Sequence, residues 1–329
     1  MAWKNIKQRS LNDGMLIQHK ALTELDNILK IIKWQNIEKY LVDLHNSKKG
    51  ERAYPPLMMF KALLLQSWYN LSDQQLESQL ARDLLFRRFV GIGLDDSIPD
   101  HSSIWRFRQK ISEEGRLAFL FDRLNQGLTE AGLLIKQGQV SIIDASVIEA
   151  KQCRPHKGSD GENTQDKEAG YNVKQSSDGK MKTTFGFKAH MNVDEDGFVS
   201  QVITTAGNVH DSQCLEDLLT GAEAVVYADS AYASAAHDAL LKQKNIKNGI
   251  LKRAYRNRPL TTTEKQHNKS LSSIRSTVER VFGILKQHYG MGKARYLGKQ
   301  RNHARLLLMS MAYNLKRGLA IQRSCMAVC

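Results

Sequence analysis

The sequence predicts an α/β protein in which a mixed five-stranded sheet is flanked by helices and preceded by an all-helical domain. Three observations support this. From residue 140 onward, short β-branched runs alternate with amphipathic segments of helical period, as in a sheet covered by helices. Residues 184–193 and 198–205 alternate apolar and polar side chains around an Asp-Glu-Asp-Gly turn, which predicts an antiparallel hairpin. Before residue 136, helical patterns alone are found.

Residues 1–136 are therefore predicted to form a helical domain. Apolar residues in 15–46 follow the 3.6-residue period, and Pro55 and Pro56 suit the first turn of a buried helix through Tyr69. Ser72 and Gln75 form a candidate capping box for the next helix, over 73–82.

A further helix in this domain is expected from Asp100 to Ile111, and it carries Trp105, Arg106, Arg108 and Lys110. Short helices with basic ends and tight turns are typical of helix-turn-helix regions, although many helical bundles share the pattern. We expect double-stranded DNA to contact this domain.

Residues 137–329 are predicted to form the sheet-containing domain. It should include a polar loop at 151–183, where apolar residues are scarce, and a basic helical part at the C-terminal end. Beyond Asp238 the only acidic residues are Glu264 and Glu279, whereas Lys and Arg recur throughout.

The formal net charge of +14 favours a polyanionic partner, and nucleic acid is the commonest one. A basic surface that only aids solubility is the alternative. No run of about eighteen apolar residues predicts a membrane span, and no apolar signal-peptide core is present. The four cysteines lack zinc-site spacing, so a reduced, intracellular protein is expected.

Three carboxylates are the candidate catalytic residues. Asp144 and Asp229 each follow an apolar run that reads as a strand, and Glu279 lies in a predicted helix. A lone Asp after a strand is usually a cap or turn residue, but two such strands can be neighbours, with their ends at the sheet edge where ligands gather. An all-oxygen set suits Mg²⁺ or Mn²⁺, and two such ions can clamp a reacting phosphodiester.

Arg275, Glu279 and Lys286 share one face of the predicted helix over 274–289, beside an apolar stripe that would pack on the sheet. Arg275 and Lys286 are thus placed to hold phosphate oxygens beside the metal ions. The simpler interpretation of Arg275 and Glu279 is an ordinary ion pair at i, i+4.

Several motifs resemble those of bacterial insertion-sequence transposases of the Asp-Asp-Glu type, close to family five and related to family four. In the first part of the chain they are Tyr54-Pro55, Gln66-Ser-Trp-Tyr-Asn-Leu-Ser72 and Ile98-Pro-Asp100. In the second part they are Asp144-Ala-Ser-Val-Ile-Glu-Ala150, Phe185-Gly-Phe-Lys-Ala-His190, Asn208-Val-His-Asp-Ser212, Ala228-Asp-Ser-Ala-Tyr232, Ile274-Arg-Ser-Thr-Val-Glu-Arg-Val-Phe282 and Lys293-Ala-Arg-Tyr296.

This resemblance implies an RNase H-like fold, Mg²⁺-dependent DNA cleavage and joining, and binding to terminal inverted repeats and target DNA. It also implies a homodimer in the active complex and a cytoplasmic, nucleoid-associated location. Ser272 replaces the tyrosine of the family's Tyr-x₂-Arg-x₃-Glu-x₆-Lys signature. Lys188 and His190 are assigned to DNA phosphate contact, with a structural hydrogen bond as the alternative for His190.

Two other functions remain open. One is a domesticated, non-catalytic DNA-binding regulator, although all three carboxylates are present. The other is an RNase H-like nuclease that cleaves strands without joining them.

Overall fold

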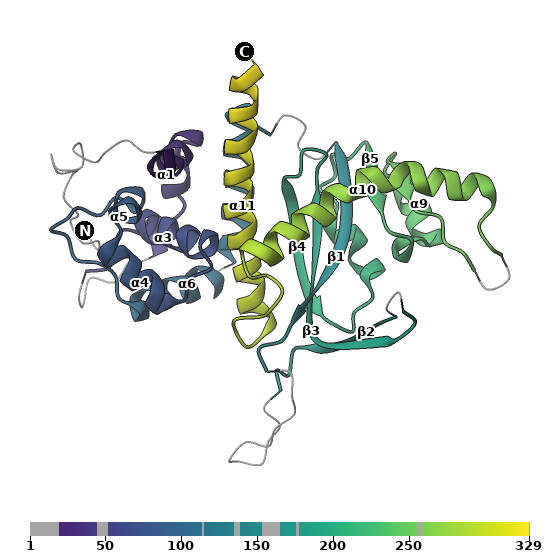
Figure 1. The fold of residues 1–329 in the computed structure, drawn as a ribbon, viewed down its shortest axis with the longest axis horizontal. Helices are drawn as coiled ribbons and strands as arrows, with labels where there is room; N and C mark the ends of the chain where they lie inside the picture. Colours follow the sequence, from purple (N-terminus) through teal and green to yellow (C-terminus); the bar gives the residue numbers. More distant parts are fainter. Residues whose placement is uncertain are drawn as a thin grey trace. The chain divides into compact units, whose positions relative to one another are not determined.

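A computed structural model of the chain is shown in Figure 1. It describes residues 20–44, 52–113, 115–134, 139–152, 165–175, 178–255 and 258–328. The chain forms two compact units, one of Met1–Leu134 with Leu307–Cys329 and one of Ile135–Leu306. The first division, between Leu134 and Ile135, lies near the predicted boundary at residue 136, and the roles predicted for the two domains stay predictions. Residues from Leu307 onward, however, were predicted in the second domain and belong to the first unit.

The first unit, called here the helical unit, is built from helices joined by short turns. They are α1 (Lys20–Ile31), α2 (Trp34–Glu38), the 3₁₀ turn η2 (Val42–Leu44), α3 (Pro56–Trp68), α4 (Asp73–Arg82), α5 (Leu84–Val90), α6 (His101–Glu113), α7 (Arg116–Glu130) and the second part of α11 (Lys299–Val328). Residues 15–19, 45 and 46 of the predicted first helices lie outside the described residues. Within the described ranges, no helix has the length and apolar character needed to cross a membrane.

Local signals fix the limits of several helices. The capping box before α4 is confirmed, since Ser72 Oγ accepts a hydrogen bond from Gln75 N (3.1 Å) and Ser72 N donates to Gln75 Oε1 (2.8 Å). Asp100 Oδ1 accepts a hydrogen bond from Ser103 N (2.8 Å) at the start of α6. The predicted helices over 57–69, 73–82 and 100–111 are therefore present.

Buried polar contacts explain why the end of α11 belongs to the helical unit. Trp68 Nε1 donates a hydrogen bond to the carbonyl oxygen of Ala312 (2.6 Å). Asn314 Nδ2 donates to Asn125 Oδ1 (2.8 Å), and both asparagines are buried. A buried amide without a partner is costly, so these bonds attach α11 to α3 and α7.

The second unit, called here the sheet unit, contains one six-stranded sheet. Its strands are β1 (Val140–Glu149), β2 (Gly170–Gln175), β3 (Met181–Val193), β4 (Val199–Ala206), β5 (Val225–Ala228) and β6 (Lys247–Ile250). The order is β2-β3-β1-β5-β6, and β4 also pairs with β3. Pairs β1–β5 and β5–β6 are parallel, whereas β3 is antiparallel to β1, β2 and β4.

The prediction of five strands was wrong by one. The additional strand, β2, lies inside the segment predicted to be a polar loop, and it pairs with the start of β3. Both segments expose most of their side chains, so they lack the apolar content by which the other strands were recognised. Residues 153–164 of the predicted loop lie outside the described residues.

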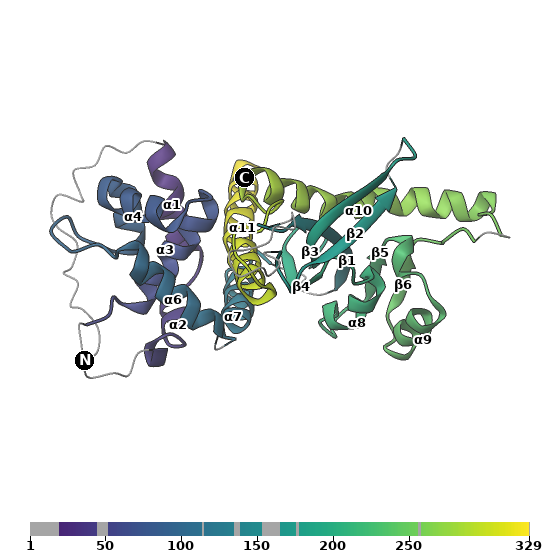
Figure 2. The ribbon, with the colours of Figure 1, turned by 90° about the horizontal axis from the view of Figure 1, so that it is seen from below.

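Helices cover both faces of the sheet, as Figure 2 shows. On one side are η3 (Asp211–Cys214), α8 (Leu215–Leu218) and α9 (Ala235–Gln243), which share a core with Ile143, Val226 and Ile250. On the other side is α10 (Thr262–His288), which packs against β1, β3 and β5. Because successive residues of a strand face opposite sides, Asp144 points to the side of α10 when Ile143 points to the core of α8 and α9.

Helix α10 begins earlier than predicted. The sequence predicts this helix only from residue 274, but Thr261 and Glu264 form a capping box at its start. Thr261 N donates to Glu264 Oε2 (2.9 Å), and Glu264 N donates to Thr261 Oγ1 (3.2 Å). This first half of the helix extends past the sheet and has no buried stripe, so hydrophobic periodicity could not reveal it (Figure 1).

Candidate active site

Asp144 lies where one strand pairing ends and another continues. Strand β1 pairs with β3 up to Glu149, so Asp144 lies inside the strand. The prediction that the strand ends at Asp144 was wrong. The parallel pairing of β1 with β5, however, stops at Ile143, opposite Ala228. The edge of β1 toward β5 is therefore released from that pairing at Asp144.

Asp229 follows Ala228 directly, so the two aspartates occupy equivalent positions on neighbouring strands. Asp229 caps the short 3₁₀ turn η4 (Ser230–Tyr232), where its Oδ1 accepts a hydrogen bond from Ser230 N (2.6 Å). Asp144 Oδ1 likewise accepts from the next backbone amide, Ala145 N (2.8 Å). In both residues a local amide fixes the carboxylate orientation.

Helix α10 supplies the third carboxylate. Its apolar stripe, formed by Val278, Val281, Phe282 and Leu285, is buried as predicted and sets the rotation of the helix on the sheet. Glu279 lies on the face of α10 next to this stripe. Arg275, which precedes Glu279 by one helical turn, lies on the same face. The side chain of Arg275 is 12% exposed, against 60% for Glu279, so the arginine lies deeper in the site.

Arg275 brings the three carboxylates together. Its Nη2 lies 3.9 Å from Asp144 Oδ2 and 3.7 Å from Glu279 Oε1, and its Nη1 lies 3.8 Å from Asp229 Oδ1. These distances exceed hydrogen-bond length, so the attraction is that of ion pairs. The buried Arg275 Nε has no hydrogen-bond partner. The structure thus unites Asp144, Asp229, Glu279 and Arg275, which the sequence predicted as neighbours.

Burial and charge make Asp144 unlike an ordinary surface aspartate. Desolvation raises the pKa of Asp144 to about 6, opposed by the hydrogen bond from Ala145 and the charge of Arg275. The negative charge of Asp229 raises it further, whereas Lys174 lowers it. A nearby cation would stabilise the ionised form of this largely buried carboxylate and lower its pKa.

The donor chemistry of the site fits a hard divalent ion. Asp144, Asp229 and Glu279 present carboxylate oxygens from three elements toward a single cationic group, and Mg²⁺ and Mn²⁺ prefer such oxygens. Among the described residues, no three acidic, histidine or cysteine side chains are spaced to ligate one ion. Here the guanidinium of Arg275 supplies the positive charge between them.

Lys188 and His190 make internal contacts in this structure. Lys188 is buried and pairs through Nζ with Asp211 Oδ1 (2.8 Å) and the carbonyl oxygen of Val209 (2.8 Å). His190 is fully buried, its Nε2 lies 2.8 Å from Thr205 Oγ1, and desolvation lowers its pKa to about 4, so the ring is neutral. Both hold β3 to the segment that follows it, and phosphate contact by these two residues stays a prediction.

Glycines allow the strands around the site to approach closely. A Cβ at Gly186 would collide with the carbonyl oxygen of Ile148, and one at Gly207 would collide with that of Gly170. These glycines permit close backbone approach where β1, β2, β3 and the end of β4 meet.

Lys286 follows Glu279 on α10, and desolvation lowers its pKa, with Lys174 and Lys182 adding to the decrease and Asp144 opposing it. Lys174 and Lys182 lie in the β2–β3 hairpin and were missed by the sequence prediction. The available signal was the alternation of Tyr171 and Val173 with polar residues before Asp178-Gly179, a typical hairpin pattern.

In the helical unit, part of the predicted basic surface is structural. Arg108 is buried and forms a bidentate pair with Asp73 (2.6 and 2.7 Å), while Arg87 donates to the carbonyl oxygens of Gly93, Leu94 and Asp96. Trp105 and Arg106 are exposed on α6 and remain available to a partner.

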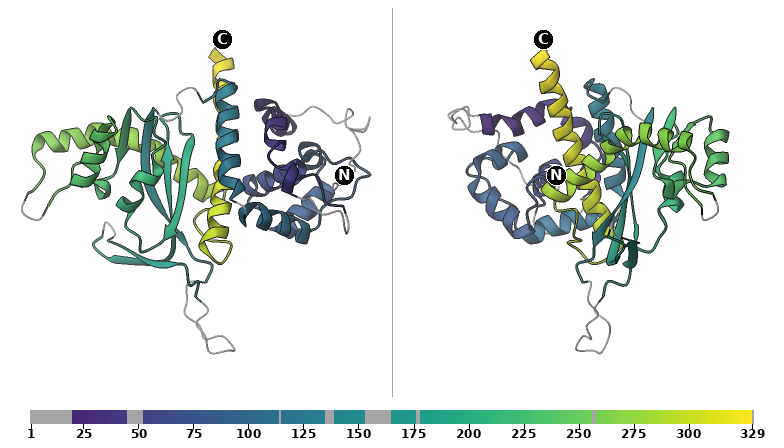
Figure 3. Two further views of the ribbon diagram at one scale, coloured as in Figure 1. Left: turned by 180° about the vertical axis from the view of Figure 1, so that it is seen from behind. Right: turned by 45° about the vertical axis from the view of Figure 1, so that its right-hand side comes forward.

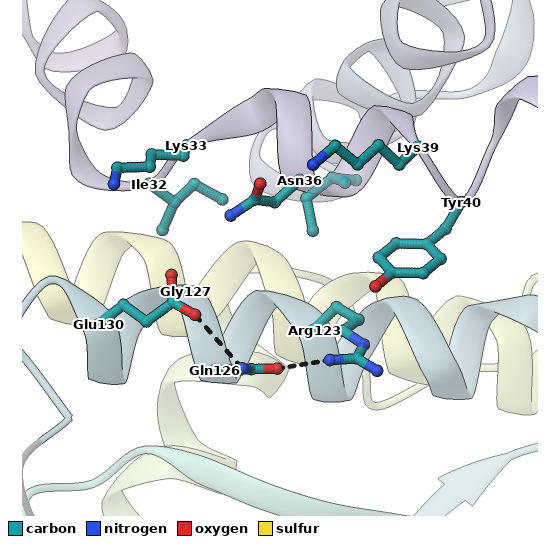
Figure 4. A pocket seen from close by; sticks show the side chains of 10 residues that line it. Ile32, Lys33, Asn36, Lys39, Tyr40, Arg123, Gln126, Gly127 and Glu130 are labelled. Atoms are coloured by element: carbon teal, nitrogen blue, oxygen red, sulfur yellow. Dashed lines mark hydrogen bonds between the residues drawn. The ribbon is translucent and has the colours of Figure 1, made fainter.

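The helical unit also contains a cavity of about 230 Å³ lined by residues of α2 and α7, by the two residues between α1 and α2, and by the two residues that follow α2 (Figure 4). Along α7, Gln126 accepts a hydrogen bond from Arg123 (2.7 Å) and donates one to Glu130 (3.3 Å). Since these polar groups bond to one another, the cavity gives no sign of a specific ligand.

Comparisons with known proteins bear on both parts of the chain. A family model described as "Transposase DDE domain" matches residues 135–315, and one described as "Transposase domain (DUF772)" matches residues 15–110.

Among solved structures, the piggyBac transposase synaptic complex with hairpin DNA is 11% identical, with 91% of this chain and 80% of that chain covered and a TM-score of 0.37. The Mos1 strand transfer complex is 9% identical (84% and 81% covered, TM-score 0.18), and the Mos1 paired-end complex with left transposon end is 12% identical (83% and 82% covered, TM-score 0.20). These superpositions are too loose to establish a shared fold.

The family matches, which span the acidic site and most of the helical unit, show that this chain belongs to the transposases with a DDE domain.

Proposed function

We propose that this transposase belongs to insertion-sequence family five, related to family four, and that it binds the terminal inverted repeats of its element. It then cleaves the DNA strands at those ends and transfers them into target DNA. The observation that supports this activity is the convergence of Asp144, Asp229 and Glu279 from two strands and a helix around one cation.

The three carboxylates are the proposed ligands of two divalent ions, Mg²⁺ or Mn²⁺. When bound, such ions activate the attacking water or 3′-hydroxyl and stabilise charge on the leaving oxygen of a phosphodiester. The chain's own contribution is position: local amides orient Asp144 and Asp229, and the apolar stripe of α10 orients Glu279. Arg275 and Lys286 would hold phosphate oxygens beside this centre.

The helical unit is the proposed reader of the DNA ends, since α6 exposes Trp105 and Arg106. We expect a homodimer in the active complex, because two element ends must be processed together, and a cytoplasmic, nucleoid-associated location.

The test uses the full chain and a supercoiled plasmid that carries the inverted repeats flanking its reading frame. Asp144→Asn, Asp229→Asn and Glu279→Gln should each abolish Mg²⁺-dependent nicking and joining, while gel-shift affinity for the repeats stays within about twofold of wild type. Glu216→Gln, an exposed carboxylate of the same unit paired with Lys244, is the control and should retain activity.

The same assay separates the alternatives. If the wild type nicks but never joins, the protein is a nuclease without strand transfer. If it binds the repeats but the triad variants match the wild type in every step, the acidic site is not catalytic and a DNA-binding regulator is favoured.

A further inference from the structure

Two lysines lie directly opposite each other in the β2–β3 hairpin. The register pairs Lys174 with Lys182, and their neighbours Asn172 and Thr184 form the next pair on the same face. Both lysines are exposed. Like charges at directly opposed positions destabilise a hairpin. The pair of lysines therefore lowers the stability of the hairpin.

The hairpin separates its side chains by type. The opposite face carries Tyr171, Val173 and Met181, which are 52%, 52% and 66% exposed. Because successive side chains of a strand point to opposite faces, the charged side chains in the paired part of the hairpin all lie on one face. Figures 2 and 3 show the hairpin extending beyond the rest of the sheet.

The charged face is close to the acidic site. Lys174 and Lys182 both act electrostatically on Lys286 of α10, and Lys174 also acts on Asp144. The two hairpin lysines therefore lie within electrostatic range of Lys286, and Lys174 and Lys286 also lie within that range of Asp144. Within the described part of the chain, none of the three lysines forms an ion pair or a side-chain hydrogen bond.

The acidic site needs such a neighbour. Before metal ions bind, the three carboxylates repel a phosphodiester, because Arg275 alone offsets only part of their charge. Lysine ammonium groups bind phosphate oxygens as point charges, and their mutual repulsion is relieved when a polyanion lies between them.

We propose that the basic face of the β2–β3 hairpin, formed by Lys174 and Lys182 together with Lys286 of α10, is a docking surface for the phosphates of the DNA strand that leads into the acidic site. This inference rests on the proposed function. It assigns to the hairpin the role of holding the phosphates of the substrate strand beside the acidic site.

The experiment compares the full-length wild type with Lys174→Ala/Lys182→Ala. The ligands are a duplex carrying the sequence that flanks the reading frame and an unrelated duplex of equal length, titrated across a series of salt concentrations. Because phosphate contacts are independent of sequence, the double variant should lose affinity for both duplexes, and the slope of log K against log salt should fall by about two.

Matched variants sharpen the result. Lys242→Ala/Lys247→Ala removes two exposed lysines of α9 and β6 from the same unit and should leave the salt slope unchanged. Lys174→Arg/Lys182→Arg keeps the charge and should retain most of the slope. In the absence of DNA, the melting temperature of the alanine double variant should equal or exceed that of wild type, since a repulsive pair is removed; a purely structural role would lower it.

The outcomes distinguish this inference from the proposed function. If the wild type binds DNA and nicks it while the hairpin variant matches the Lys242→Ala/Lys247→Ala control in affinity and salt slope, the docking surface is refuted and the proposed function stands. If the wild type neither binds nor nicks either DNA, the proposed function fails and this inference fails with it.

Discussion

The guanidinium Nη2 of Arg275 lies 3.9 Å from Asp144 Oδ2, and the same side chain lies within ion-pair distance of Asp229 and Glu279. One largely buried cation thus lies among three carboxylates from three separate elements and offsets part of their charge. In the protein without metal, Arg275 is the counter-ion that allows these carboxylates to lie close together. A divalent ion bound by the same oxygens would compete with it for their charge.

We predict that Arg275→Ala lowers the thermal stability of the metal-free protein and strengthens its binding of Mn²⁺ in the absence of DNA. Removing the guanidinium leaves three carboxylates without their counter-ion, which favours a metal ion in its place. The expected gain in affinity is about tenfold, or roughly 1.4 kcal/mol. Isothermal titration of the DNA-free protein with Mn²⁺ measures it.

The control is Arg280→Ala, which removes an exposed arginine from the same helix. It should change neither the metal affinity nor the stability of the metal-free protein appreciably. Equal Mn²⁺ affinity in Arg275→Ala and wild type would show that Arg275 does not compete with the ion, and its role would then be confined to DNA.

A second prediction concerns pH and the turn between β3 and β4. Desolvation raises the pKa of Asp194 to about 7, although its Oδ1 accepts a hydrogen bond from Phe198 N (2.8 Å). Because the folded pKa exceeds the usual value, the stabilising contribution of the neutral carboxyl is present below about pH 4. It is lost as the pH rises through about 7.

Asp194→Asn keeps an oxygen acceptor for Phe198 N and removes the titration. The variant should therefore be more stable than wild type at pH 8, by about 1–2 kcal/mol, and the difference should shrink toward pH 5. Urea unfolding at both pH values provides the measurement. A difference that is the same at pH 5 and pH 8 would exclude titration of Asp194 in this range.

A third prediction separates structural from DNA-binding arginines in α6. Arg108→Ala should destabilise the helical unit by about 3–5 kcal/mol, because it leaves the carboxylate of Asp73 without its buried partner. Arg106→Ala should leave the melting temperature unchanged and weaken binding to the terminal repeats. Melting curves and gel shifts on the same preparations test both statements. Equal melting temperatures of the two variants would show that Arg108 has no greater structural role than Arg106.

Much of the site could be predicted from the sequence, because its signals are local. The apolar stripe of α10 fixes the rotation of the helix, so Arg275 and Glu279 could be placed on the same side. Apolar runs before Asp144 and Asp229 revealed two buried strands. That β1 continues past Asp144 could not be foreseen, since its continuation depends on pairing with β3 far along the chain.

Other features were missed because they have little apolar content. Strand β2 and the first half of α10 expose most of their side chains, so periodicity gave no signal, although a turn motif and a capping box were present. The division of α11 between the two units depends on contacts such as Asn314 with Asn125, which are distant in sequence. Local patterns carry no information on such pairs.

The last prediction follows from that division. A fragment of residues 1–136 ends before the part of α11 that completes the helical unit, so it lacks the acceptor of Trp68 Nε1 and the partner of Asn125. It should therefore fail to unfold cooperatively, and DNA-end binding by this unit should be measured on the full chain. In the full chain, Asn314→Ala should cost about 1–3 kcal/mol by removing a buried hydrogen bond from Asn125, whereas Arg323→Ala, on an exposed position of the same helix, should cost almost nothing. A cooperative melt of the 1–136 fragment at the temperature of the full chain would show that the helical unit folds without α11.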